Sequence, residues 1–352
     1  MKNTSVVTVA QLAGFDEVID VRSPAEFAED HIPGATNHPV LDDAERARVG
    51  TIYTQVSAFE ANKVGAALIS RNIALHLERD FHDRPRNWRP LIYCWRGGKR
   101  SGALAQVLSE VGWRVARLDG GYKAYRRAVI DDIERLPERL RWRVLCGTTG
   151  SGKSRLLRAL ERHGAQVLDL EQLASHRGSV LGSMPDTPQP SQRWFESLLW
   201  RRLRELDPAQ PVFVESESRR IGRIAVPAAL LDAMWRSPCI VLDADAATRV
   251  ALLLQDYPHF SADAELLVRS LVPLAKHYGN ATIAHWQSLA AAGATDELVR
   301  DLLARHYDPA YLRSIRAHYQ RLPQALALRV DGIDDDAMRA LAAQVTAGTC
   351  TA

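Results

Sequence analysis

The chain has 352 residues, of which 46% are hydrophobic and 25% are charged, and its formal net charge is +3. This composition is that of a globular protein, and the moderate numbers of Gly, Pro and Cys exclude a collagen-like, a disordered and a disulfide-rich chain. The length favours two domains. The apolar runs are as short as strands, whereas a membrane-spanning helix needs about 20 apolar residues, so no membrane segment is expected.

The four cysteines, Cys94, Cys146, Cys239 and Cys350, lie far apart in the sequence and form no C-x-x-C pair. This distribution argues against a disulfide framework and against a zinc knuckle. No group of His, Cys and Asp has the spacing of a metal site, so no metal ligands are predicted. The first residues lack the long apolar segment of a signal peptide. We therefore expect a protein of the reducing cytoplasm.

Residues 1–125 alternate between strand and helix patterns, which predicts a parallel sheet with helices on both faces. Ser23 precedes a helix that begins with Pro24, and the sequence SPAE has the form of a capping box. The expected strands are Glu17–Val21, Pro90–Cys94 and Trp113–Leu118.

The rest of the chain divides into further segments. Residues 42–83 have apolar residues at helical spacing and are expected to form a helical insertion in the first domain. Residues 126–140 have the pattern of a charged helix broken by a proline and are expected to be a linker. Residues 141–246 again alternate between strands and helices, which predicts a second α/β domain. Residues 247–352 are expected to be a helical C-terminal region.

The first candidate site is Cys94, which ends a predicted strand and opens a Gly-rich loop that leads into a helix. Two glycines allow successive backbone N–H groups to form an anion-binding nest beside the N-terminus of that helix. Nearby positive charges favour the thiolate over the thiol, so Cys94 is expected to be a nucleophile. The alternative is a buried core cysteine. The predicted nest consists of Trp95, Arg96, Gly97, Gly98, Lys99 and Arg100.

The first domain resembles the rhodanese family. The segments that carry the resemblance are DVRSPAEF (20–27) with HIPGATN (31–37), YCWRGGKRS (93–101) and LDGGYKAYR (118–126). The helical insertion is longer than a minimal rhodanese carries. The resemblance implies that sulfur or selenium is bound to Cys94 as an intermediate.

The second candidate site is a phosphate loop, because residues 147–154 fit the complete pattern G-x-x-x-x-G-K-[ST] between a predicted strand and a predicted helix. Backbone amides of such a loop surround a phosphate group. Lys153 would neutralise its oxygens, and Ser154 would hold Mg²⁺ if the metal is present. The pattern does not define what is attached to the phosphate. The predicted loop residues are Gly147, Thr148, Thr149, Gly150, Ser151, Gly152, Lys153 and Ser154.

The acidic partner of this loop is less regular. Glu215 ends a predicted strand and could order Mg²⁺ and water, and Asp169 is the other candidate. A salt-bridge cluster of Glu215 and Glu217 with Arg219 and Arg220 is an equal alternative. Whether Mg²⁺ is needed and whether a nucleotide is hydrolysed therefore stay open.

Several smaller groups are secondary candidates. Arg177 and Ser179, in the loop HRGS (176–179), could hold a second phosphate or the RNA backbone, and a helix-cap turn is the alternative. Gln192 belongs to the segment QPSQ, in which Ser191 is a good N-cap. Arg219 and Arg220 could clamp phosphates. Two tyrosines, Tyr307 and Tyr311, could stack on bases, although helix packing is the favoured interpretation.

The whole chain resembles the bacterial tRNA 2-selenouridine synthases. This resemblance implies the replacement of sulfur by selenium in 2-thiouridine at the wobble position of tRNA, with selenophosphate and geranyl diphosphate as co-substrates. Besides tRNA, the enzyme that supplies selenophosphate is an expected partner. The matching segments are VGTIYTQVSAFEANKVGAAL (49–68), YCWRGGKRSG (93–102), CGTTGSGKS (146–154), HRGSVLG (176–182), QPSQ (189–192), VFVESESRRIG (212–222) and HYDPAY (306–311).

Under this hypothesis the loop 147–154 binds the geranyl diphosphate head, with selenophosphate as the competing occupant, and Cys94 carries selenium or assists its transfer. Clustered arginines would bind the tRNA backbone, in a salt-dependent way. These clusters are Arg84–Arg89, Arg96–Arg100, Arg126–Arg127, Arg139–Arg143, Arg201–Arg204 and Arg219–Arg223.

Three alternatives remain. An ATP-dependent tRNA sulfurtransferase would bind ATP at the phosphate loop and deliver sulfur from a Cys94 persulfide. A nucleotide-regulated sulfur-carrier module would pass that persulfide to a partner protein without modifying tRNA. Rhodanese sulfur transfer alone would leave the second domain without a role.

Overall fold

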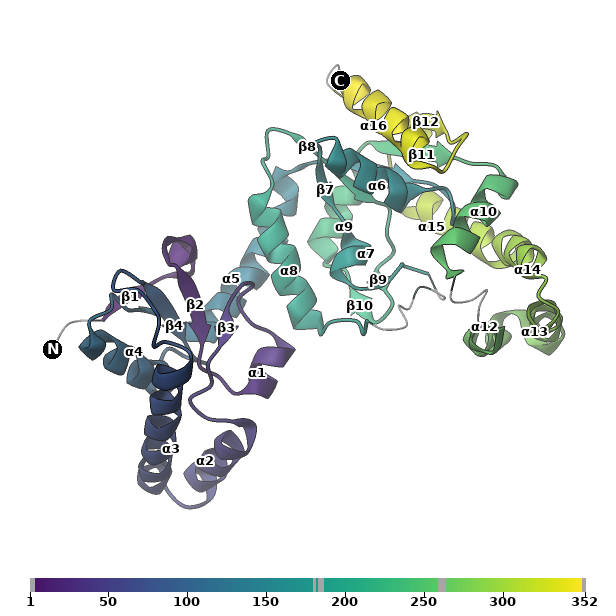
Figure 1. Cartoon of the computed structure of the whole chain (residues 1–352). Helices are drawn as coiled ribbons and strands as arrows, with labels where there is room; N and C mark the ends of the chain where they lie inside the picture. Colours follow the sequence, from purple (N-terminus) through teal and green to yellow (C-terminus); the bar gives the residue numbers. More distant parts are fainter. Residues whose placement is uncertain (1–3, 180–181, 183–186, 259–263, 350–352) are drawn as a thin grey trace. The chain divides into compact units, whose positions relative to one another are not determined.

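The computed structural model describes residues 4–179, 182, 187–258 and 264–349 (Figure 1). The chain forms two compact units. The first unit contains the chain up to Ile133 together with Pro190–Arg201, and the second contains Glu134–Gln189 and the chain from Arg202 onward. Within the described ranges, no helix is long and apolar enough to cross a membrane.

The first unit is built on a five-stranded sheet in the order β1-β5-β4-β2-β3, and every strand pair in it is parallel, as predicted. Ser23 precedes the first helix with the expected capping box. The strands are β1 (Ser5–Val7), β2 (Glu17–Asp20), β3 (Thr36–Asn37), β4 (Pro90–Tyr93) and β5 (Ala116–Leu118). The helices are α1 (Pro24–Glu29), α2 (Asp43–Gln55), α3 (Ala58–Arg79), α4 (Lys99–Val111) and α5 (Gly121–Arg135).

The expected insertion is a pair of helices, α2 and α3, which pack against each other. Gly65 of α3 faces Val49 of α2, where even a Cβ atom would make only an ordinary contact of 3.5 Å with a methyl group. The core beside the sheet is formed by buried side chains of the strands and of α3 and α4. They include Ile19, Ile73, Phe81, Ile92, Leu104 and Leu108.

Residues 190–201 belong to the first unit, which differs from the expected division at residues 125 and 141. They begin α8 (Gln192–Glu205), where Ser191 is the predicted N-cap and accepts a hydrogen bond from the N–H of Trp194 at 2.9 Å. The ring of Trp194 stacks on His31 at 4.0 Å, and Ser197 donates to Asp30 at 2.7 Å. These contacts join residues far apart in sequence, so local patterns could not reveal them.

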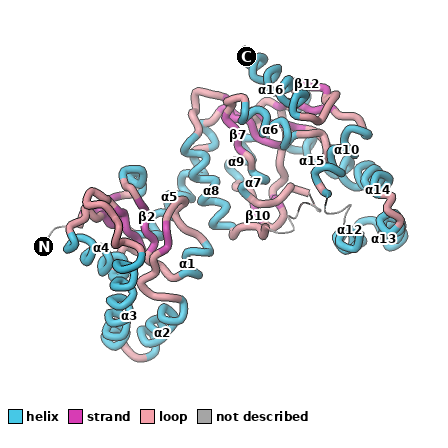
Figure 2. Tube along the Cα trace, viewed as in Figure 1, coloured by secondary structure: helices cyan, strands magenta, loops and turns pink. Residues whose placement is uncertain are grey.

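The second unit contains a five-stranded parallel sheet in the order β12-β11-β6-β8-β7 (Figure 2). The strands are β6 (Arg141–Cys146), β7 (Gln166–Leu168), β8 (Pro211–Glu215), β11 (Cys239–Asp243) and β12 (Leu326–Arg329), and β9 (Arg220–Ile221) forms a hairpin with β10 (Ile224–Ala225). The helices are α6 (Lys153–Arg162), α7 (Leu170–Leu173), α9 (Ala228–Trp235), α10 (Ala246–Asp256), α12 (Ala264–Leu271), α13 (Ala275–Ala291), α14 (Thr295–Leu302), α15 (Asp308–His318) and α16 (Asp335–Thr349).

The end of the chain completes the phosphate-loop sheet, which corrects the expectation of a purely helical region from residue 247 onward. Strand β12 pairs with β11, and α16 packs on α6. Leu328, Met338 and Val345 are at most 3% exposed in the same core as Leu156 of α6. Strand β12 is short, and three of its four residues are exposed, so its sequence lacks the continuous apolar run of a buried strand.

Candidate functional site

The phosphate loop has the predicted position between strand β6 and helix α6. Gly150 has a φ of +80°, and a Cβ atom there would lie 3.0 Å from the carbonyl oxygen of Arg249, so this turn requires glycine. Lys153 donates from Nζ to the carbonyl oxygen of Gly147 at 2.8 Å. The cation of Lys153 is therefore held over the loop itself, where a phosphate group can reach it.

Two residues from the C-terminal half support this loop: Arg249, which was missed, and Tyr311, which was considered only for base stacking or helix packing. The hydroxyl of Tyr311 accepts a hydrogen bond from the N–H of Gly147 at 2.6 Å. Arg249 donates from Nε to the carbonyl oxygen of Thr149 at 2.9 Å and forms a bidentate ion pair with Asp308. Tyr311 and Asp308 lie in the segment HYDPAY, which the sequence had singled out, whereas no local pattern marked Arg249.

The loop opens into a cavity of about 680 Å³ within the second unit. A volume in this range suits a small phosphorylated ligand. The cavity contains most of the predicted residues of this unit. Those that line it are Thr149, Gly150, Gly152, Lys153, Ser154, Asp169, Arg177, Ser179, Glu215 and Glu217.

Acidic side chains gather on one wall of this cavity. Glu215 ends β8 and is 4% exposed, and burial raises its pKa to about 7 although the charge of Lys153 opposes the shift. Burial and repulsion from Glu215 raise the pKa of Glu217 to about 8. Asp169 is the N-cap of α7, accepts a hydrogen bond from Gln172 N–H at 2.8 Å, and has its pKa raised by burial. Both predicted acidic partners of the loop are thus present.

Three secondary candidates do not lie in this cavity. Arg219 and Arg220 are exposed, and within the described chain neither forms an ion pair with Glu215 or Glu217, so the alternative of a salt-bridge cluster is wrong. Arg219 lies over the ring of Trp235 instead, at 5.7 Å. Gln192 belongs to the first unit and donates to Glu196 in α8 at 2.9 Å.

The loop that begins at His176 lines the cavity as a turn. The guanidinium of Arg177 lies over the ring of Tyr257 at 4.7 Å and donates to the carbonyl oxygen of Asp256. Ser179 also faces the cavity. Val180 and Leu181, which belong to the segment HRGSVLG, lie outside the described residues.

An apolar pocket adjoins the phosphate-loop cavity. Five residues line both the pocket and the cavity: Thr149, Ser179, Leu253, Tyr257 and Tyr307. The remaining walls of the apolar pocket come from helices α10, α12 and α14 and from the turn that follows α14. They are Leu254, Leu267, Thr295, Leu298, Val299, Leu302 and Leu303. The polar phosphate-loop cavity and the apolar pocket therefore adjoin each other within the second unit.

Cys94 lies directly after β4, at the start of the predicted loop. Its side chain is 3% exposed, and its sulfur lies 3.3 Å from the hydroxyl oxygen of Ser101 in the first turn of α4. The N–H of Tyr122 donates to the carbonyl oxygen of Cys94 at 2.8 Å. Gly121 allows this approach, because a Cβ atom there would lie 2.2 Å from the same oxygen. The segment LDGGYKAYR thus fixes the cysteine loop.

Two of the three cationic side chains of this loop already contact other side chains. Arg100 forms an ion pair with Glu26 at 2.6 Å, and Lys99 donates to the side chain of Asn62 at 2.9 Å. Arg96 is exposed, and Trp95 is 38% exposed. Of the three predicted cations, Arg96 and Lys99 are exposed, and Arg100 is half-buried in its ion pair.

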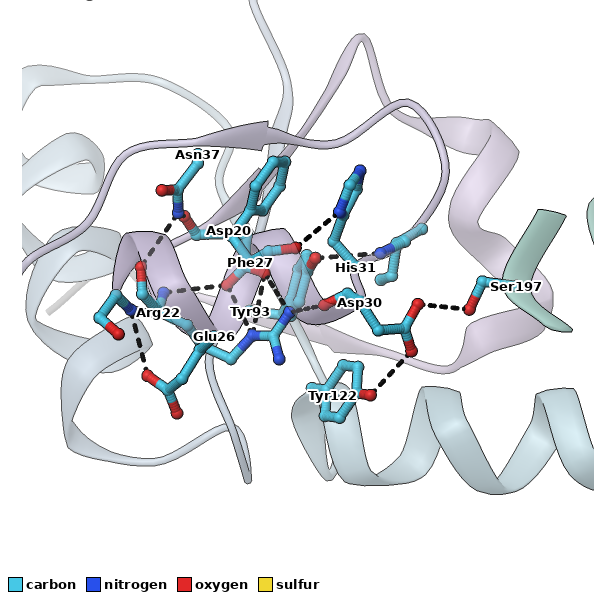
Figure 3. Close-up of polar contacts among 12 residues, drawn as sticks. Asp20, Arg22, Glu26, Phe27, Asp30, His31, Asn37, Tyr93, Tyr122 and Ser197 are labelled. Atoms are coloured by element: carbon cyan, nitrogen blue, oxygen red, sulfur yellow. Dashed lines mark hydrogen bonds and ion pairs between the residues drawn. The ribbon is translucent and has the colours of Figure 1, made fainter. Parts of the chain in front are cut away.

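A buried polar network lies behind this sheet (Figure 3). Arg22 is 1% exposed and donates to the carboxylate of Asp20 and to the carbonyl oxygen of Asp30, both at 2.6 Å. Its guanidinium lies 4.0 Å from the ring centre of Tyr122, whose hydroxyl donates to the carboxylate of Asp30 at 2.7 Å. The segment DVRSPAEF is therefore structural, and it connects to the cysteine loop through Tyr122.

Among the described residues, two clusters have the ligand types of a metal site, although linear spacing indicated none. His38, His76 and Asp80 form one of them in the first unit. Their facing atoms already bond one another: Asp80 lies 3.1 Å from Nδ1 of His38 and 2.7 Å from Nδ1 of His76. The other cluster consists of Glu171, Glu215 and Glu217.

A parallel sheet with a cysteine at a strand end, and a second sheet with a phosphate loop, define a rhodanese-like domain joined to a P-loop domain. The family models agree: residues 6–128 match "Rhodanese-like domain", and residues 140–268 match "tRNA 2-selenouridine synthase AAA domain".

Curated relatives define the family more narrowly. The chain is 34% identical to a tRNA 2-selenouridine synthase of Aeromonas salmonicida, over 87% of this chain and 89% of that protein. It is 34% identical to one of Shewanella halifaxensis over 84% of this chain and 87% of that protein. It is 41% identical to one of Nitrosomonas europaea over 68% of this chain, and the match spans 63% of that protein. The chain belongs to the tRNA 2-selenouridine synthase family.

Proposed function

We propose that this chain acts in the cytoplasm on 2-thiouridine at the wobble position of tRNA and replaces its sulfur by selenium from selenophosphate. The route runs through S-geranyl-2-thiouridine, which is made from geranyl diphosphate. The observation that carries this proposal is the apolar pocket that adjoins the phosphate-loop cavity. An allylic diphosphate has one charged and one apolar end. The phosphate-loop cavity suits the charged end, and the apolar pocket suits the apolar end.

The first step needs a stabilised leaving group. The sulfur of 2-thiouridine attacks C1 of the geranyl chain, the C–O bond breaks, and its electron pair leaves with the diphosphate, while the N3 proton passes to solvent. Lys153 and the amides of the loop 147–154 stabilise the leaving diphosphate. Leu298 and Leu302 would contact the chain.

In the second step, the selenium of selenophosphate attacks C2 of the base, the C2–S bond breaks, and the alkylated sulfur leaves as geranyl thiolate, which takes a proton from solvent. Water then cleaves the P–Se bond and releases phosphate. Cys94 assists this transfer, and its loop with Arg96 would hold the anionic donor. The enzyme that supplies selenophosphate is the expected partner in this step. Exposed arginines would bind the tRNA backbone, although several already form internal ion pairs, such as Arg84 with Glu17 at 2.8 Å.

Nucleoside mass spectrometry tests both steps. The full chain is incubated without oxygen with tRNA that bears 2-thiouridine, and geranyl diphosphate and selenophosphate are supplied separately and together. We expect Lys153→Ala to lose the geranylated product and Cys94→Ser to lose the selenated product. Lys63→Ala, an exposed lysine on α3, is the matched control. Unchanged 2-thiouridine under all conditions would refute the proposal.

Filling the apolar pocket tests the chain site separately. Val299→Trp should raise the KM for geranyl diphosphate by about tenfold or more and leave binding of inorganic diphosphate unchanged. Val272→Trp, at a residue 54% exposed outside the pocket, is the control. An unchanged KM in Val299→Trp would place the chain elsewhere.

An ATP-dependent tRNA sulfurtransferase is the second candidate, and Glu215 favours it. This carboxylate ends the strand beside the phosphate-loop strand, where ATPases hold Mg²⁺ and order water. ATP hydrolysis stimulated by unmodified tRNA, with 2-thiouridine as product, would support this candidate over selenation.

A further inference from the structure

Three glutamates from separate parts of the chain meet beside the phosphate loop. Glu171 comes from α7, Glu215 ends β8, and Glu217 follows it in the next loop. One carboxylate oxygen from each lies within 4.8 Å of the other two, and all three side chains line the phosphate-loop cavity. The steps assigned above to Lys153 and Cys94 give these side chains no role.

The buried carboxylate of Glu215 is incompletely paired. The residue is 4% exposed, and its Oε1 atom has no hydrogen-bond partner among the described residues. An ionised oxygen that has left water without gaining a donor or a cation is costly, so such atoms usually face a ligand. One carboxylate oxygen of Glu215 lies within 4.8 Å of those of Glu171 and Glu217, and the side chain lines the phosphate-loop cavity.

The space around the cluster is kept open on one side by Gly178. Its φ is +66°, and a Cβ atom there would lie 2.6 Å from Oε1 of Glu171 and 3.5 Å from both carboxylate oxygens of Glu217. A side chain at this position would press on the carboxylate end of Glu171, which would have to shift. Glycine here therefore lets Glu171 keep its place in the cluster.

No ion pair within the described chain neutralises the cluster. Lys153 is a nearby cation, but its ammonium group donates to the carbonyl oxygens of Gly147 and Thr148. Within the described chain, no salt bridge joins Lys153 to any of the three glutamates. The site offers three carboxyl groups and only oxygen ligands.

We propose that Glu171, Glu215 and Glu217 together bind one hard divalent cation, Mg²⁺ or Mn²⁺, beside the phosphate loop. Carboxylate oxygens suit these ions, and ligands on opposite sides of Mg²⁺ lie about 4 Å apart, which fits the spacing of the cluster. P-loop folds commonly place Mg²⁺ between the loop Ser and the acidic strand end, here Ser154 and Glu215. Glu171 and Glu217 are the additional ligands assigned here.

The role of the ion rests on the proposed function, because the ion would neutralise the charge of the diphosphate that leaves from geranyl diphosphate. The binding itself does not depend on that function. A cation held by three protein carboxylates should bind before any phosphate compound arrives, since the ligands already lie together.

Titration of the metal-free full chain with Mn²⁺, followed by the electron paramagnetic resonance signal of the free ion, tests the site without substrate. We expect one saturable Mn²⁺ ion per chain, displaced by Mg²⁺. Glu171→Gln and Glu217→Gln should each weaken binding by about tenfold or more. Glu205→Gln, at an exposed glutamate of α8, should bind as the wild type does. A parallel melting experiment should show Mn²⁺ raising the Tm of the wild type and not that of the Glu171→Gln, Glu217→Gln double variant.

Absence of saturable binding, or unchanged binding in both single variants, would overturn the metal site. Intact folding of each variant is verified by its melting transition and by Lys153-dependent binding of inorganic diphosphate without metal. Mn²⁺ binding as expected, with no geranylated nucleoside, would retain the metal site and refute the proposed function. Geranylation without the expected Mn²⁺ binding would do the reverse.

Discussion

The hydroxyl of Tyr311 accepts a hydrogen bond of 2.6 Å from the N–H of Gly147, the first residue of the phosphate loop. The two residues are 164 positions apart in sequence. The same hydroxyl lies 3.1 Å from that of Ser216, and the ring lies 5.5 Å from the ammonium group of Lys153. Tyr311 therefore joins the loop, the acidic strand end and the loop cation.

Removing the hydroxyl of Tyr311 should loosen the phosphate loop. Tyr311→Phe leaves the N–H of Gly147 without its acceptor, and we expect a loss of about 1–3 kcal/mol in the free energy of unfolding of the second unit. The affinity for inorganic diphosphate should change as well, because the N–H of Gly147 is no longer held in place by the tyrosine hydroxyl. Urea denaturation and calorimetric titration measure the two effects. Tyr53→Phe, at an exposed tyrosine of α2, is the control, and equal behaviour of both variants would contradict this role.

The hydroxyl of Ser101 should influence the reactivity of Cys94. It lies 3.3 Å from the sulfur in the first turn of α4, within hydrogen-bond distance, so the hydroxyl can hold the sulfur in place. Ser101→Ala should slow alkylation of Cys94 by iodoacetamide by about threefold to tenfold, as measured by peptide mass spectrometry. Ser109→Ala, at a buried serine of the same helix, should react at the wild-type rate. Faster alkylation in Ser101→Ala would show that the serine acts only as a steric cover.

Ser197 should stabilise the first unit from α8. It is fully buried and donates to the carboxylate of Asp30 at 2.7 Å (Figure 3). Hydrogen bonds to charged groups contribute about 1.5–3 kcal/mol, so Ser197→Ala should lower the unfolding free energy of this unit by that amount. Hydrogen exchange read by mass spectrometry would locate the loss at β2, α1 and α8. Thr54→Ala in the exposed part of α2 should change stability by less than about 0.5 kcal/mol.

Acid should destabilise the first unit through His31. Burial between Phe27 and Trp194 lowers the pKa of His31 below its ordinary value, so the unfolded chain binds a proton more readily than the folded chain does. Stability contributed by the neutral ring is therefore present above about pH 6.5 and is lost as the pH falls.

Between about pH 7 and pH 5.5 the wild type should lose up to about 1 kcal/mol more unfolding free energy than His31→Gln. Glutamine keeps a donor for the carbonyl oxygen of Phe27 but does not titrate. The comparison between the two proteins removes the contribution of Asp30, whose pKa is raised by burial and which acts in the opposite direction. Parallel pH profiles for the two proteins would contradict the prediction.

Met338 of α16 should be essential to the phosphate-loop core. It is 1% exposed, and its Cε atom would lie 3.3 Å from a Cβ atom at Gly152. Met338→Ala removes buried volume, so we expect a loss of about 2–5 kcal/mol in unfolding free energy and weaker binding of inorganic diphosphate. The exposed neighbour Arg339→Ala provides the control. Normal stability of Met338→Ala would show that α16 packs only loosely.

Local signals account for the parts of the site that were predicted. The phosphate loop and the cysteine loop each lie in one short segment, and the residues of each determine the backbone shape. The cluster of Glu171 with Glu215 and Glu217 was only partly predictable, because Glu171 reaches it from another strand connection. Tyr311 and Arg249 contact the loop through tertiary packing. Strand β12 is defined by its pairing with β11, for which its own sequence carries little evidence.

The assignment of Pro190–Arg201 to the first unit bears on how this chain is made. A nascent chain released only as far as Ile133 lacks the donor for Asp30 and the ring that stacks on His31. By the time Arg201 leaves the ribosome, the phosphate loop has also emerged, but β8, β11 and β12 have not. Each unit therefore needs residues that are translated after part of the other unit. A recombinant fragment cut at the linker would yield an incomplete first unit.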